Sequence, residues 1–147
     1  MSDFISSSVL VTSAIAWFIA QFIKVIIVLV KNKKLDFRRF IGSGGMPSSH
    51  SSFVVSLATS IGIKDGFASD IFAASAVMAL VVMYDAAGVR RAAGQQARIL
   101  NKLVREWEKN DFTQTEKKLK ELLGHTPFEV FAGAILGIAV ALLRHAF

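Results

Sequence analysis

The sequence predicts an all-α integral membrane protein: a helical bundle of about four transmembrane helices with an amphipathic helical insertion on the cytoplasmic side. Hydrophobic residues make up 53% of the 147 residues, which is high for a soluble domain and typical of a chain with several segments in lipid. The length suits one domain, so we expect residues 1–147 to form a single membrane-embedded unit.

The composition also restricts the chemistry and the partners. No cysteine is present, which excludes disulfides, thiol catalysis and cysteine-ligated metals. A net charge of +6 suits anionic lipid headgroups, an anionic substrate or nucleic acid. Because the chain is so hydrophobic, we expect the membrane and a lipid to be its partners and expect no nucleic acid. A homo-oligomer is compatible with the sequence.

Four apolar runs are the expected membrane spans. The first is long enough to cross a bilayer and is interrupted only by Gln21 and Lys24. The second and fourth are marginal as isolated spans, so we expect them to pack inside a bundle. The spacing of Gly133 and Gly137 in the fourth run favours close helix contact. The four runs cover residues 8–30, 51–63, 69–88 and 127–143.

Residues 89–124 form a polar stretch that keeps helical periodicity. Its apolar residues recur at the spacing of one helix face with basic residues among them, which indicates an interfacial helix. Thr113 and Glu116 match a capping box for a second short helix, and Gly124 is suited to end it. The apolar positions are Ile99, Leu100, Leu103, Val104 and Trp107.

The basic residues predict the topology. Two segments, 31–39 and 90–120, hold 14 of the 17 lysines and arginines, and four alternating spans would place both segments on one side. By the positive-inside tendency that side is cytoplasmic, with both termini outside, and we expect a bacterial inner (plasma) membrane. Several polar residues then fall together at the cytoplasmic ends of helices: His50, Asp85, Arg90, Arg91 and His125.

The first polar motif runs from Gly44 to Ser51 and interrupts the hydrophobic pattern just before the second apolar run. Glycines such as Gly45 permit tight backbone conformations, and a helix beginning near Ser49 would direct free N–H groups at an anion. The alternative is that Ser48 or Ser49 only caps the helix. Capping alone does not explain why the glycines and His50 occur together.

The second motif places His125 four residues before Glu129 at the start of the fourth run. The two side chains lie on one helix face, and a carboxylate on one imidazole nitrogen fixes the tautomer and leaves the other nitrogen free to attack. The alternative is structural, because Thr126 and Glu129 also match a capping box with Pro127 at the first helical position. Both roles can hold at once.

Further charged residues lie near these motifs. The rigid, permanently charged guanidinium groups of Arg90 and Arg91 suit the equatorial oxygens of a phosphoryl group, although either arginine could be a positive-inside anchor instead. Asp85 is suited to orient an arginine or a histidine. Lys24 is costly in lipid, so it should face the bundle interior or extend to the membrane surface.

These motifs resemble the type-2 phosphatidic acid phosphatase superfamily, which also includes bacterial acid phosphatases and vanadium haloperoxidases. Segments 44–51, 84–96 and 122–133 are more closely similar to its divergent branch of small membrane proteins, the acid phosphatase/vanadium-dependent haloperoxidase-related proteins. The resemblance implies that His125 is the nucleophile and that Glu129, in place of the usual aspartate, orients it.

The resemblance also assigns the first motif. Pro47-Ser48-Ser49-His50 is similar to the superfamily's Pro-Ser-Gly-His, which implies that Ser48 binds phosphate and that His50 is the general acid. Ser49 stands in place of the glycine, and Pro47 and Gly45 support the turn.

The basic residues of the family pattern are only partly matched. Lys31 and Arg38 have the spacing of the superfamily's first motif, and Lys24 and Lys34 are rival candidates for its lysine. The arginine expected before His125 is missing, and Arg90 or Arg91 could supply that charge from another helix. The basic residues expected near the substrate phosphate are Lys24, Lys34, Arg38, Arg90 and Arg91.

The expected function is hydrolysis of a lipid phosphomonoester or diphosphate through a phosphohistidine, without metal or cofactor, in phospholipid metabolism. A cytoplasmic site favours a lipid made on the inner leaflet, such as phosphatidylglycerol phosphate or phosphatidic acid. The rival interpretation is a non-catalytic membrane protein that binds or transports an anionic headgroup or ion with the same basic pocket.

Overall fold

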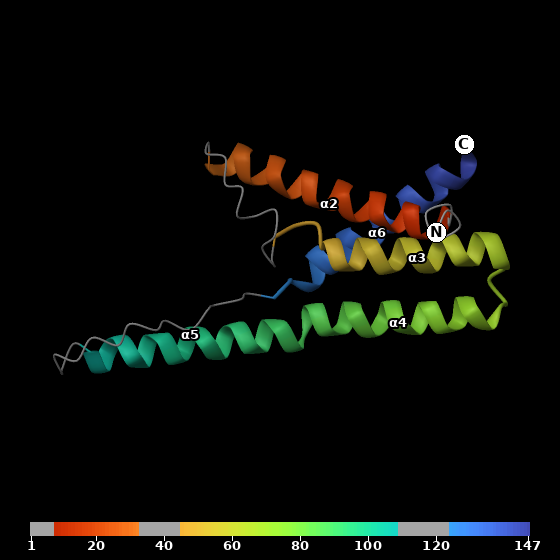
Figure 1. Cartoon of the computed structure of the whole chain (residues 1–147). Helices are drawn as coiled ribbons and strands as arrows, with labels where there is room; N and C mark the ends of the chain where they lie inside the picture. Colours follow the sequence, from red (N-terminus) through yellow and green to blue (C-terminus); the bar gives the residue numbers. More distant parts are fainter. Residues whose placement is uncertain (1–7, 33–44, 109–123) are drawn as a thin grey trace, which may run out of the picture.

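The computed structural model describes residues 8–32, 45–108 and 124–147, and their regular structure is entirely helical (Figure 1). The expected all-helical membrane bundle is therefore confirmed. Lys34, Arg38 and the short helix expected after Thr113 lie outside the described residues. The helices are α2 (Ser8–Asn32), α3 (Ser49–Asp65), α4 (Asp70–Ala87), α5 (Val89–Glu108) and α6 (Pro127–Ala146).

Helix α3 is the centre of the bundle. It packs against α2, α4 and α6, and Figure 1 shows it between α2 and α4. Several of its serines are fully buried, and two donate to backbone carbonyls: Ser52 Oγ to Ala16 O at 3.1 Å and Ser56 Oγ to Phe53 O at 3.0 Å. These bonds satisfy hydroxyl groups that would be costly to bury in lipid.

Three stretches of the described chain are long and apolar enough to cross a bilayer: Val9–Val30, Asp70–Val104 and Pro127–Ala146. The expected second span, α3, has 17 residues and is about 25 Å long at 1.5 Å per residue, somewhat less than the roughly 30 Å of a hydrocarbon core. Its enclosure by three other helices explains why its sequence is shorter and more polar than theirs.

The outer helices present apolar side chains away from the bundle. Phe22 of α2, Leu80 of α4 and Phe131 of α6 are all more than 60% exposed. In water such exposure would be unfavourable, whereas lipid chains solvate these groups well. The exposed faces are therefore the lipid-facing surface of the bundle.

Helix α6 lies unusually close to α3 because two glycines face it. A methyl group at Gly133 would collide with the carbonyl oxygen of Ser48, and one at Gly137 would lie 2.6 Å from the carbonyl oxygen of Ser52. The close contact predicted from the spacing of these glycines is confirmed. The two helices run parallel in Figure 1, so their N-termini meet at one end of the bundle.

Helix α5 continues from α4 beyond that end. The helical conformation is broken only at Gly88 (φ −102°, ψ −80°), and Figure 1 shows α5 extending past the other helices roughly along the line of α4. This helix forms the first part of the insertion expected over residues 89–124.

The packing of α6 on α3 predicts that Gly133→Ala destabilises the protein. Overpacking at the Ser48 carbonyl should cost about 1–3 kcal/mol, because backbone cannot move aside as a side chain does. Thermal unfolding of the purified protein in detergent, followed by circular dichroism, measures the effect. Ile135→Ala, on the exposed side of the same helix, is the control and should change the midpoint little; equal midpoints for both variants would contradict the packing.

Candidate active site

The N-termini of α3 and α6 are joined directly. The Ser48 N–H donates to the Glu129 carbonyl oxygen at 2.9 Å, so the residue that caps α3 is bonded to the first turn of α6. Each helix terminus carries a partial positive charge from its unpaired N–H groups. Two such termini side by side favour a negatively charged ligand at this end of the bundle.

His125 lies between the ends of α4 and α6. Its backbone N–H donates to the Ala86 carbonyl oxygen at 3.1 Å, and its side chain is 3% exposed. Nδ1 lies 3.2 Å from Glu129 Oε2. Because a carboxylate only accepts, Nδ1 of the neutral ring carries the proton in this contact, and Nε2 then holds the lone pair.

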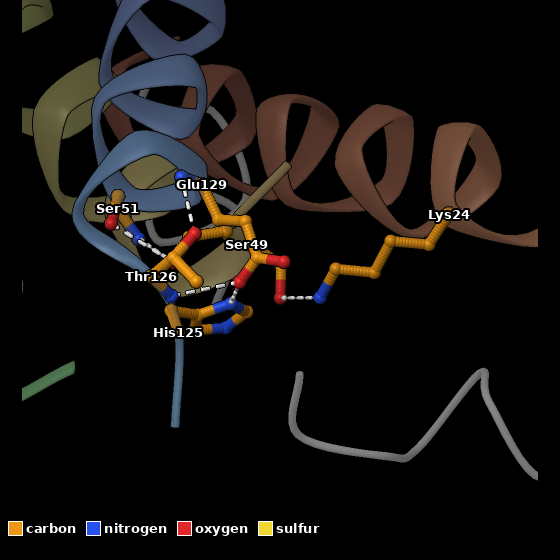
Figure 2. A network of polar contacts seen from close by, with 7 residues as sticks. Lys24, Ser49, Ser51, His125, Thr126 and Glu129 are labelled. Carbon is orange, nitrogen blue, oxygen red and sulfur yellow. Dashed lines mark hydrogen bonds and ion pairs between the residues drawn. The ribbon is translucent and has the colours of Figure 1, made fainter. Parts of the chain in front are cut away.

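Glu129 also completes the N-terminus of α6. The same oxygen, Oε2, accepts the Thr126 N–H at 3.0 Å, while Thr126 Oγ1 accepts the Glu129 N–H at 3.3 Å (Figure 2). The predicted capping box, with Pro127 in the first turn, is therefore confirmed. The geometry lets one carboxylate cap the helix and contact the histidine at once.

His50 stands opposite His125. Its ring centroid is 6.5 Å from that of His125, with an angle of 63° between the ring planes, and His50 is exposed whereas His125 is buried. The two imidazole rings therefore lie near each other where the helix N-termini meet, within reach of one bound phosphoryl group.

Lys24 reaches this region from the middle of α2. It is 4% exposed, and its Nζ donates to Ser49 Oγ at 3.1 Å (Figure 2). Of the two alternatives for this lysine, the structure shows the one facing the bundle interior. A basic side chain is thus held at the first residue of α3.

The turn before α3 has the conformation that its sequence favours. Gly45 has a φ of +86°, which suits glycine, and Pro47 is buried. Ser48 Oγ caps α3 by accepting the Ser51 N–H at 3.3 Å, and it also accepts the Ser51 hydroxyl at 2.9 Å. The capping alternative for Ser48 therefore applies, and phosphate binding by its hydroxyl stays a prediction.

The structure describes the remaining expected site residues, Asp85, Arg90 and Arg91, in less detail. Asp85 is half-buried in the last turn of α4, next to the carbonyl that receives the His125 N–H. Arg90 and Arg91 lie in the first turn of α5, and their side chains are outside the described residues. In the described part of the chain, no group of three or more histidine, aspartate or glutamate side chains is arranged to hold a metal ion.

Two contacts were missed by the sequence analysis. The Ala86 carbonyl anchors His125, and no sequence pattern marks a backbone acceptor of this kind. The pairing of Lys24 with Ser49 was also not foreseen. A signal for it existed, since a lysine inside an apolar span needs a buried polar partner and the serine-rich start of α3 offers one.

Comparison with known proteins supports the relationship indicated by the motifs. The chain is similar to the uncharacterized membrane protein YuiD of Bacillus subtilis (strain 168), with 45% identity over 144 residues that cover 91% of each chain. No solved structure matches it. Residues 5–140, which include both histidine motifs, match the model of the divergent PAP2 family, and the chain belongs to that family.

Proposed function

We propose that this protein is a membrane phosphatase that hydrolyses a lipid phosphomonoester or diphosphate through a phosphohistidine intermediate. The observation that carries the proposal is the pair of histidines, 6.5 Å apart between ring centroids, of which one contacts a carboxylate through Nδ1. They lie where two helix N-termini meet, and family membership adds weight to a phosphatase chemistry.

The first half-reaction transfers the phosphoryl group to His125. The Nε2 lone pair forms a bond to phosphorus as the bond from phosphorus to the lipid oxygen breaks, and its electron pair stays on that oxygen. His50 donates a proton to the oxygen, so that a phosphomonoester releases the lipid as an alcohol and a diphosphate releases it as a lipid monophosphate. The carboxylate of Glu129 stabilises the positive charge that develops on the His125 ring.

The second half-reaction releases phosphate. A water molecule gives a proton to His50 as its oxygen attacks phosphorus, and the bond from phosphorus to Nε2 breaks with its electrons returning to His125. Inorganic phosphate leaves and both histidines regain their starting protonation. His50 is suited to exchange protons with water because it is exposed.

Charge on the phosphoryl oxygens needs fixed positive partners. Lys24, held at Ser49, and the N–H groups at the start of α3 are the described candidates. Arg90 and Arg91 follow Ala86 by four and five residues along the chain, and we propose that they contribute the charge that the family's missing arginine would carry.

The side of the membrane restricts the substrate. The basic segments favour a cytoplasmic active site, so we propose a lipid of the inner leaflet, such as phosphatidylglycerol phosphate or phosphatidic acid. The rival function, binding or transport of an anion, requires the same positive charges and no nucleophile. The two functions therefore differ at His125: the phosphatase requires this histidine for turnover, and the binding protein does not require it as a nucleophile.

The first test replaces the histidines. His125→Ala should abolish both turnover of lipid phosphates and formation of an acid-labile phosphoenzyme, because it removes the nucleophile. His50→Ala should slow a substrate with an alkoxide leaving group more than p-nitrophenyl phosphate, whose product needs little protonation. A phosphate-release assay on purified protein, with chelator and vanadate as further arms, measures these effects.

The control for this test is His145→Ala, because His145 lies at the far end of α6 and its loss should leave turnover unchanged. Vanadate should inhibit and a chelator should not. Wild-type turnover by the His125 variant would overturn the catalytic assignment. Anion binding without turnover, in the wild-type protein as well as in the variants, would favour the binding protein. Activity restored by magnesium after chelation would exclude the metal-independent mechanism.

Glu129→Gln separates the two roles of the carboxylate. The amide oxygen can still accept the Thr126 N–H, so we expect α6 to keep its cap and the variant to keep its thermal midpoint. Turnover should fall by roughly 10²-fold or more, because an amide cannot stabilise a charged imidazole as a carboxylate does. A thermal midpoint lowered along with the rate would instead show that the loss is structural.

The topology is tested by introducing one cysteine at a time. The native sequence contains no cysteine, so a thiol reagent can react only at the introduced position. Lys102→Cys should be shielded from an impermeant thiol reagent in intact cells and should react after the membrane is permeabilised. Phe147→Cys, at the end of α6, should react in intact cells. The reverse pattern would place the histidines on the outer face and would exclude an inner-leaflet substrate.

A further inference from the structure

We propose that the apolar stripe of α5, formed by Ile99, Leu100 and Leu103, binds the surface of a bilayer that contains anionic lipid. The three side chains are 61%, 48% and 56% exposed and lie on one face of the helix. This inference concerns an interaction surface and does not depend on the proposed phosphatase activity.

The lengths of α4 and α5 support a position of α5 outside the hydrocarbon core, although the apolar stretch Asp70–Val104 continues into α5. Helix α4 has 18 residues and α5 has 20, which correspond to about 27 Å and about 30 Å. Helix α4 alone nearly fills a hydrocarbon core of roughly 30 Å. Helix α5 therefore begins at the membrane surface, at the same end of the bundle as His50 and His125.

The charge of α5 complements an anionic surface. Its sequence contains five arginine or lysine residues and two glutamates, and the exposed residues Arg98 and Lys102 lie outside the apolar stripe, on the polar part of the helix surface. A helix with an apolar stripe beside basic residues lies in the headgroup region with its stripe in the lipid and its charges near the phosphates. A second copy of α5 would match the stripe but would place like charges together.

The junction at Gly88 allows the required change of direction. In Figure 1 α5 runs roughly along the line of α4, and among the described residues the side chains of the stripe are exposed. Gly88 is the one non-helical residue between the two helices, and rotation at this residue alone would lay α5 on the bilayer. Ala86, two residues earlier, accepts the His125 N–H, so the surface-bound helix would gather anionic lipid beside the histidines.

The test uses the full chain in lipid nanodiscs and nitroxide labels on single cysteines. Labels at Ile99→Cys and Leu103→Cys report on the stripe, and Arg98→Cys on the opposite side of the helix is the matched control. Leu80→Cys, in the lipid-facing part of α4, gives the signal of a buried label. Collisions with oxygen and with a water-soluble nickel complex measure the depth of each label in phosphatidylcholine discs with and without phosphatidylglycerol.

With phosphatidylglycerol, the stripe labels should become accessible to oxygen and shielded from nickel, while the Arg98 label stays accessible to nickel. The Leu103→Cys variant is also made with Arg98→Gln and Lys102→Gln together. As reported by its label, this pair of substitutions should lower the ratio of surface-bound to free helix by roughly an order of magnitude or more. High salt should have the same effect.

Three results would overturn the proposal. Stripe labels that are accessible to nickel in every lipid would show that α5 stays in water. Spin–spin broadening between labels, independent of lipid composition, would show that a second copy covers the stripe. Shielding from both reagents, equal in both lipids, would show that the chain's own segment 109–123 covers it.

Discussion

The close approach of α6 to α3 is the constraint on which the rest of the site depends. Gly133 allows α6 to contact the backbone at Ser48, and the Ser48 N–H then bonds to the Glu129 carbonyl oxygen. Because the two helices are parallel, this contact brings both N-termini, and the histidine at each, to one place. A larger residue at Gly133 would collide with the Ser48 backbone and so push the two histidine motifs apart.

The polar interior of the bundle has two distinct origins. Ser52 and Ser56 donate to nearby carbonyls, so their burial is explained by helix packing alone. Lys24 differs, because an ammonium group inside a membrane bundle costs far more than a hydroxyl and its neighbour Ser49 is uncharged. Helix packing alone does not explain its burial, whereas the proposed role of a basic group near the substrate phosphate would.

The sequence predicted the helices well because their apolar runs are long and the glycine, proline and capping signals mark their ends. It also predicted that Glu129 would face His125, since residues four apart on a helix are neighbours. It did not predict that Lys24 would meet Ser49, or that Ala86 would hold His125, because contacts between helices depend on packing rather than on local spacing. That Arg90 and Arg91 supply positive charge near the substrate phosphate remains a prediction.

The capping box of α6 explains Glu129 without any catalysis, so the carboxylate alone does not indicate an enzyme. The capping bonds between Thr126 and Glu129, however, do not involve the side chain of residue 125. His125 is nevertheless buried, fixed through its backbone to Ala86, and placed with Nδ1 at the capping carboxylate and its ring opposite that of His50. Burial of a titratable ring in this arrangement is the feature that capping leaves unexplained, and the proposed role of His125 as a nucleophile with a controlled tautomer would explain it.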